Sequence, residues 1–108
     1  MKVKEITSEH ILFDDGTRIT CYHENDCCEN VYADFEALKT TPIMGEDFKK
    51  LKIEGVKNTG IRIGKGYLIP CYNQQNGYYS SDLALIIKYP GGLEVEMDIS
   101  DFVKDDIY

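Results

Sequence analysis

The stretch HILFDDGTRITCYH, residues 10–23, decides the fold, because it contains two alternating runs on either side of a tight-turn signal. Gly16 follows an aspartate at the turn, and glycine readily takes the positive φ that a two-residue hairpin turn requires. Residues 10–14 and 17–23 are therefore predicted to form antiparallel strands. In the second strand, alternation places Cys21 and His23 on the same face.

The remainder of the chain repeats this pattern of short alternating runs between turn residues. Further strands are predicted at residues 2–7, 30–35, 48–54, 61–63, 67–72, 83–89 and 93–99. The most apolar run, 83–89, is expected to be the central strand, and the lysine-rich run 48–54 to lie near an edge. Pro70 is expected at an edge or a bulge, since proline cannot donate to the ladder. A helical turn is expected before Pro42, and Ser100 is a candidate cap for a short terminal helix.

The fold class that follows is mainly β, and α+β at most. Residues 1–108 form a single domain, because a chain of 108 residues has no room for two independent cores. We expect an antiparallel β-meander, sandwich- or roll-like, with one or two short helical turns.

Charge and hydropathy narrow the function classes. The formal net charge of -7 disfavours a nucleic-acid binder, since such binding depends on Lys and Arg at the phosphates. No apolar leader precedes the first strand, and the longest apolar run, Leu83–Ile87, is far too short to span a bilayer. The protein is therefore expected in the cytoplasm, with reduced thiols and without a membrane partner.

The densest group of chemically active side chains is His23-Glu24-Asn25-Asp26-Cys27-Cys28-Glu29. With Cys21, the residues His23, Cys27 and Cys28 offer the soft ligands that Zn²⁺ prefers, although the spacing matches no known zinc pattern. The same thiols could form a disulfide, or one could act as a nucleophile with His23 as base. These readings together define a metal- or thiol-dependent alternative built on His23, Asp26, Cys27 and Cys28.

A structural role for this segment is the favoured interpretation. Free cysteine behaves as a small buried hydrophobe, and Asp26 would bond turn amides. His23 would be half-buried and satisfied by Asp26 or Glu29. By the same reasoning Cys71 is predicted to lie in the core, and His10 to face solvent.

A second polar cluster, Asn76-Gly77-Tyr78-Tyr79-Ser80, contains a turn signal beside two tyrosines. Tyr78 and Tyr79 could stack on a ligand or contact a protein partner, because tyrosine is enriched at interfaces. Alternatively, the two tyrosines pack against the sheet and hold the loop in place.

The motifs H-x2-D-C-C-E-x-V-Y, residues 23–32, and N-G-Y-Y-S, residues 76–80, resemble those of a family of small uncharacterised proteins from phages, prophages and bacteria, a domain of unknown function. The resemblance covers nearly the whole chain, apart from residues 44–57. It implies a phage or bacterial cytoplasmic setting and suggests that the two motifs belong together. It implies no particular activity. Bulkier residues stand in that pattern where this chain has Cys21 and Cys71, which weakens any metal site that needs Cys21.

These observations predict a small non-catalytic binding protein whose partner is a protein. The predicted binding residues are His23, Asp26, Cys27, Cys28, Glu29, Asn76, Tyr78 and Tyr79. No cofactor is expected, and the alternative is a zinc site of Cys21, His23, Cys27 and Cys28.

Overall fold

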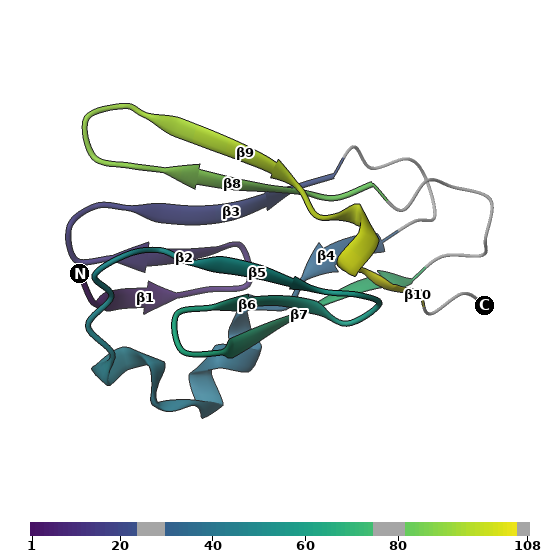
Figure 1. Ribbon diagram of the computed structural model, residues 1–108, viewed down its shortest axis with the longest axis horizontal. Helices are drawn as coiled ribbons and strands as arrows, with labels where there is room; N and C mark the ends of the chain where they lie inside the picture. The colour runs from purple at the N-terminus through teal and green to yellow at the C-terminus, as the bar shows by residue number, and fades with distance from the viewer. Residues whose placement is uncertain (24–29, 75–81, 106–108) are drawn as a thin grey trace.

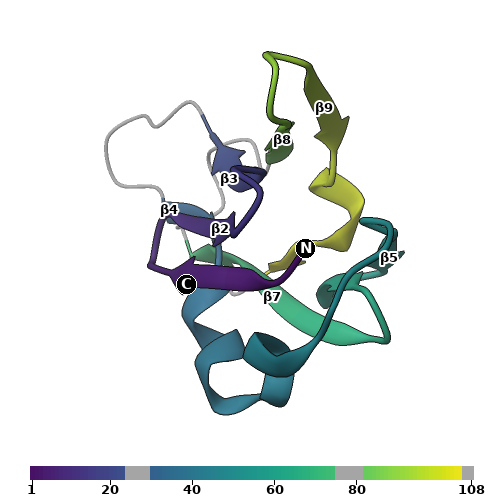
Figure 2. The ribbon, with the colours of Figure 1, turned by 90° about the vertical axis from the view of Figure 1, so that its left-hand side faces the viewer.

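The chain forms two β-sheets that lie on either side of one apolar core (Figures 1 and 2). The structure, a computed structural model, describes residues 1–23, 30–74 and 82–105. The first sheet has the order β1 (Val3–Ile6), β2 (His10–Phe13), β3 (Arg18–Tyr22), β8 (Ala84–Lys88) and β9 (Glu94–Asp98). The second contains β10 (Lys104–Asp105), β7 (Tyr67–Gln74), β6 (Gly60–Ile63) and β5 (Ile53–Val56), with β4 (Asn30–Ala33) also paired to β7. Apart from the parallel β10–β7 pair, the described strand pairs are antiparallel, which confirms the predicted mainly antiparallel fold.

The β2–β3 hairpin forms as predicted from its turn. Gly16 has a φ of 95°, and the Phe13 amide donates to the Thr17 carbonyl at 2.8 Å. The register pairs Ile11 with Ile19, and both side chains are fully buried in the core. The predicted alternation therefore describes the packing of this hairpin.

Strand β7 changes partners at Pro70. Residues 67–70 pair with β6, whereas residues 71–74 pair with β4 on one side and, at 72–73, with the short strand β10 on the other. Pro70 lies opposite Gly60 at the end of the β6 ladder, where the missing amide of proline is tolerated. This partner change brings β4 to the far end of β7.

The described helical structure consists of three short 3-10 helices: η1 (Phe35–Thr40), η2 (Pro42–Gly45) and η3 (Ser100–Phe102). Thr41 is extended before Pro42, as predicted, and separates η1 from η2. These two helices lie against β1 and bury Leu38 and Ile43 (Figure 1). Within the described residues, no helix has the length and apolar character that a bilayer crossing would need.

The strand predicted over residues 48–54 is wrong for residues 48–52, because β5 begins only at Ile53. The Phe48 amide donates to the Met1 carbonyl at 2.7 Å, and the amino group of Met1 donates to the Phe48 carbonyl at 3.0 Å. Phe48 is therefore fixed by its two bonds to Met1 and is buried in the core. Strand β5 does lie at the edge of its sheet.

Three smaller predictions also need correction. Strand β8 was predicted to be the central strand, but β3 occupies the middle of the five-stranded order, and β8 lies between β3 and β9. Ser100 does not cap η3: its hydroxyl donates to the Asp98 carboxylate at 2.5 Å. The His10 side chain is 21% exposed rather than open to solvent, and its Nε2 lies 3.1 Å from the Glu5 carboxylate.

Candidate functional site

Both motif segments attach to the described fold at the same end of the molecule. The first leaves the end of β3 and rejoins at β4, and the second leaves the end of β7 and rejoins at β8. Tyr22 pairs with Ala84 across β3 and β8, while Asn30 pairs with Gln74 across β4 and β7. The four attachment points are therefore two neighbouring pairs, one on each sheet (Figure 1).

His23 connects the described ends of the two segments. Its Nδ1 donates to the carbonyl oxygen of Asp82, which lies just before β8. Because a carbonyl oxygen can only accept, this bond places the proton of the neutral ring on Nδ1. The ring is half-buried, as predicted, and its described partner is the main chain of Asp82, whereas the predicted partners Asp26 and Glu29 lie outside the described residues.

A hydrogen-bond network fixes the chain where the second segment rejoins the sheet. The Leu83 amide donates to the Ser100 hydroxyl at 3.1 Å, and this hydroxyl donates to the Asp98 carboxylate. The Ser100 amide donates to the same carboxylate oxygen at 3.0 Å, so these two bonds hold the pKa of Asp98 below its usual value. The Ile99 amide also donates to the Leu83 carbonyl at 2.9 Å. The start of β8 is thereby tied to η3.

A surface hollow of about 390 Å³ lies over these residues, on the outer face of the first sheet. Tyr22, Ala84 and Asp98 are aligned side by side on β3, β8 and β9. The small Ala84 side chain leaves room between its two larger neighbours, and Tyr22 is 58% exposed at one side. Carboxylates of Asp82, Glu96 and Asp98 also line the hollow, so its rim combines an aromatic ring with negative charge.

A second hollow of about 400 Å³ shares Tyr22, His23 and Leu83 with the first. It opens between the ends of β3 and β4, and its lining includes Cys21, Val31 and Tyr32. Tyr32 packs on Tyr72 of β7, with ring centroids 5.6 Å apart. The end of the fold where the two motif segments attach therefore presents two adjoining concave surfaces, both lined by Tyr22 and His23.

The described thiols are held in their protonated form. Burial raises the pKa of Cys71 to about 12, and its Sγ donates to the Ile69 carbonyl at 3.7 Å. Burial also raises the pKa of Cys21, and the nearby Cys71 raises it further. Cys71 lies fully in the core, as predicted, and both cysteines are free thiols. A protonated thiol is a poor nucleophile and must lose its proton to bind a metal.

These thiols lead to a first testable prediction. In the folded protein at neutral pH, Cys21 and Cys71 are expected to resist alkylation, and both should react after denaturation. Reaction of the folded protein should accelerate as the pH rises toward 12, because only then does the thiolate of Cys71 become abundant. Peptide mapping by mass spectrometry measures each cysteine separately. Rapid alkylation of either residue at neutral pH would contradict the prediction.

Other predicted site residues lie outside the described part of the chain: Asp26, Cys27, Cys28, Glu29, Asn76, Tyr78 and Tyr79. Within the described ranges, no group of three or more His, Cys, Asp or Glu side chains could hold a metal ion. Of the alternative zinc ligands, only Cys21 and His23 are described, and the raised pKa of Cys21 disfavours it as a thiolate ligand. The zinc alternative thus receives no support from these two residues.

Sequence reasoning missed the floor of this site, which is formed by Tyr22, Ala84, Glu96, Asp98 and Ser100. Alternation predicted that Tyr22 lies on the face opposite Cys21. It could not predict that β8 and β9 are the next two strands of the sheet beside Tyr22. Four of these five residues belong to strands brought together only by the β3–β8–β9 pairing.

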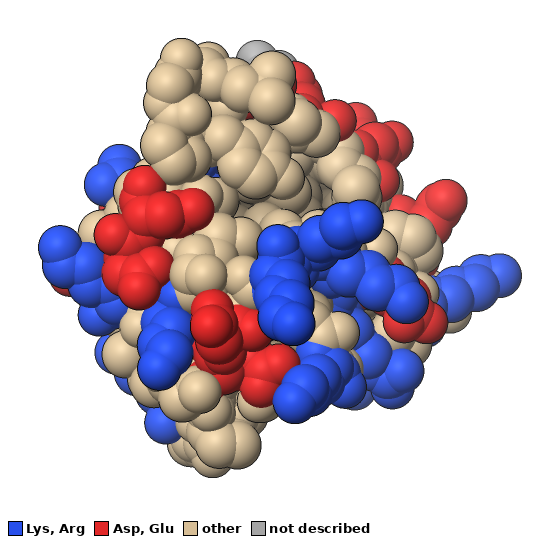
Figure 3. All heavy atoms as spheres, turned by 60° about the vertical axis from the view of Figure 1, so that its left-hand side comes forward, with Lys and Arg blue, Asp and Glu red and all other residues tan. Residues whose placement is uncertain are grey.

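Several lysines gather on the surface beside the segment that follows η2, although the net charge of the chain is negative. Lys49, Lys50, Lys52 and Lys65 line this shallow surface. Figure 3 shows Lys and Arg side chains interleaved with Asp and Glu on one face of the molecule. Glu46 and Asp47 lie among these lysines, with the Lys65 ammonium 3.7 Å from the Glu46 carboxylate. This surface therefore carries both signs of charge, whereas the carboxylates of Asp82, Glu96 and Asp98 line the hollow at the end where the motif segments attach.

The fold and this site define a small two-sheet β protein with a concave surface at the end where its two motif segments attach. The family model described as Domain of unknown function (DUF7448) matches residues 1–85, and the chain belongs to that family. No curated protein and no solved structure matches the chain. The matched residues include both motif segments, whereas β9, η3 and β10 follow them.

Proposed function

We propose that this protein is a small non-catalytic binding protein of phage, prophage or bacterial origin, which acts in the cytoplasm and recognises another protein. The observation that supports this proposal is the convergence of both motif segments on the Tyr22–Ala84 and Asn30–Gln74 pairs. Segments that start from neighbouring points on a rigid sheet are well placed to contribute to one contact surface. The resemblance to phage and bacterial proteins supplies the proposed origin.

The chemistry of the described floor favours a protein partner. Tyr22 is exposed beside two hollows, and tyrosine supplies both apolar area and a hydroxyl at interfaces. The predicted contacts Tyr78 and Tyr79 belong to a segment that attaches beside it. An acidic rim of Asp82 and Asp98 suits basic groups on the partner.

Thiol chemistry is the weaker alternative. Cys21 is the described thiol closest in sequence to His23, and its raised pKa keeps it protonated at neutral pH. His23 donates from Nδ1 to a main-chain carbonyl, which orients the ring. Binding is therefore a better use of this surface than covalent catalysis.

Affinity capture with the full chain as bait tests the proposal. The wild type is expected to retain a partner from a host lysate, and Tyr22→Ala and the double change Tyr78→Ala with Tyr79→Ala should each release it while leaving the melting temperature unchanged. Met44→Ala is the matched control, because Met44 is 49% exposed on η2, well away from the site. Equal capture by all four proteins would refute the proposed surface.

Metal analysis separates the binding proposal from its alternative. Protein purified without added metal is expected to contain less than about 0.1 equivalent of zinc, because a structural zinc site would retain its ion. Zinc near one equivalent, lost on changing Cys27 and Cys28 to Ser, would favour the metal-dependent reading.

A further inference from the structure

Strand β9 borders the first sheet and leaves one edge without a described neighbour. The Tyr89 amide donates to the Leu93 carbonyl, and the Ile99 amide donates to the Leu83 carbonyl, at the two ends of the β8–β9 ladder. In an antiparallel ladder the hydrogen-bonded residues alternate, so odd-numbered residues of β9 bond to β8. The amides and carbonyls of Glu94, Glu96 and Asp98 therefore point away from β8, toward the open edge.

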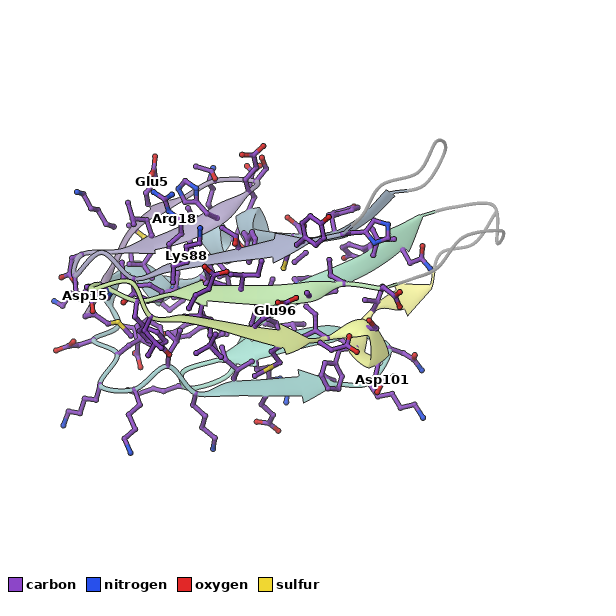
Figure 4. All side chains as sticks on the ribbon, turned by 90° about the horizontal axis from the view of Figure 1, so that it is seen from above. Glu5, Asp15, Arg18, Lys88, Glu96 and Asp101 are labelled. Atoms are coloured by element: carbon purple, nitrogen blue, oxygen red, sulfur yellow. The ribbon has the colours of Figure 1, made fainter. Side chains whose placement is uncertain are left out.

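The side chains of β9 divide into an acidic row and an apolar row. Glu94, Glu96 and Asp98 share the outer face of the sheet and are all exposed. On β8 they lie opposite Lys88, Ile86 and Ala84, so Glu94 alone of the three has a cation across from it. Figure 4 shows Lys88 and Arg18 on adjacent strands, with Glu96 farther along β9 toward η3.

The apolar row lies on the opposite face of the same strand. Leu93 is 65% exposed and Val95 is 39% exposed, although Val95 lies opposite the buried Ile87. These two residues are among the few large apolar side chains exposed on the described surface. Another strand beside β9 would cover them as it extends the sheet.

We propose that the open edge of β9 binds an extended segment of a basic protein partner, which adds to the first sheet as a further strand. Its main chain would pair with Glu94, Glu96 and Asp98. Partner residues opposite these three would be Lys or Arg on the outer face, and the residues between them would be apolar and contact Val95. The recognised pattern is thus an alternation of basic and apolar residues.

Charge selects this partner over a second copy of the chain. An antiparallel pair of β9 strands centred on Glu96 would place Glu96 opposite Glu96, and Glu94 opposite Asp98. Like charges directly opposite each other destabilise a sheet, whereas opposite charges stabilise it. The acidic row therefore opposes self-association and favours a basic strand.

This proposal shares Glu96 and Asp98 with the surface hollow but uses the main-chain edge of β9, whereas the contact surface proposed above is built around Tyr22 and the two motif segments. The edge of β9 lies outside the residues that the family model matches. If Tyr22 and the motif segments bind no partner, the proposed pairing at the edge of β9 is unaffected.

A labelled peptide that alternates lysine and valine over the length of β9 provides the probe. Fluorescence anisotropy is expected to show binding of this peptide to the full chain, and much weaker binding of a peptide with the same composition in two blocks. In hydrogen-exchange NMR, the amides of Glu94, Glu96 and Asp98 should become protected on adding the alternating peptide. The amides of Val95 and Met97, which bond to β8, should be protected already.

Two substitutions of Glu96 distinguish the contribution of main-chain hydrogen bonding from that of side-chain charge to peptide binding. Glu96→Pro removes an amide that faces the open edge without removing a bond to β8, so the melting temperature should hold while peptide binding is lost. Glu96→Lys should weaken binding about tenfold, because it replaces one attraction with a repulsion. Glu54→Lys is the matched control: it makes the same charge change on the exposed edge strand β5 of the other sheet and should leave binding intact.

Equal binding of the alternating and block peptides would overturn the proposal, as would unchanged binding by Glu96→Pro. A wild-type protein that dimerises at neutral pH, and becomes monomeric as Glu96→Pro, would also overturn it in favour of self-pairing.

Discussion

Phe13→Ala is expected to lower the free energy of unfolding by about 3–5 kcal/mol, which is a large part of the roughly 5–15 kcal/mol typical of small domains. Phe13 is 1% exposed, and its ring meets that of Phe48 edge to face, with centroids 5.5 Å apart. Removing the ring leaves a cavity at the junction of the hairpin and the segment held by Met1. Urea unfolding monitored by circular dichroism measures the loss, and the melting temperature should fall by roughly 15–25 °C.

Met44→Ala is the control for this change, because it removes an apolar side chain that is 49% exposed. Its effect should remain within about 0.5 kcal/mol. A loss below about 1 kcal/mol for Phe13→Ala would mean that the described packing of Phe13 and Phe48 is incorrect.

Gly60→Ala is expected to cost about 3 kcal/mol, because the added methyl group has no space. A Cβ at this position would lie 2.2 Å from the Ile69 carbonyl oxygen and 2.9 Å from the Pro70 Cα. Both atoms belong to the backbone of β7 and cannot rotate away, so β6 and β7 must separate. The separation occurs where β7 passes from β6 to β4, and it should also loosen the Asn30–Gln74 attachment of the motif segments.

Chemical denaturation measures the total loss, and hydrogen exchange of the β4 amides measures the local one. Gly45→Ala is the matched control, since a Cβ at Gly45 meets no atom within 4 Å. Gly60→Ala with the stability of the wild type would show that the two strands do not approach this closely at Gly60.

Local sequence signals predicted much of the fold. The turn at Gly16 and the alternation on both sides of it predicted the β2–β3 hairpin, and the apolar spacing predicted that Ile11 and Ile19 are buried. The prediction failed over residues 48–52, where the alternation is real but the main chain of Phe48 bonds to Met1 and that of Lys52 to Gly64. Alternation describes which side chains share a face and contains no information about the partner of the main chain.

The candidate site was only partly predictable for the same reason. His23 was selected by its chemistry, and its contact with Asp82 joins residues 59 positions apart in the sequence. The sequence did not indicate that Glu96 and Asp98 line the hollow, because acidic residues that alternate along a strand are typical of an ordinary solvated face. Only the β8–β9 pairing placed them beside Tyr22.

The sequence by itself determined that this chain is a small β protein, where its turns lie, and which residues of the hairpin face the core. Those properties follow from short-range rules: the period of a strand, the φ of glycine and the missing amide of proline. The tertiary structure alone decided the strand order, the shared end of the two motif segments, and the exposed edge of β9. Strand order depends on which main-chain groups meet across the whole chain, and residues close in sequence cannot specify that choice.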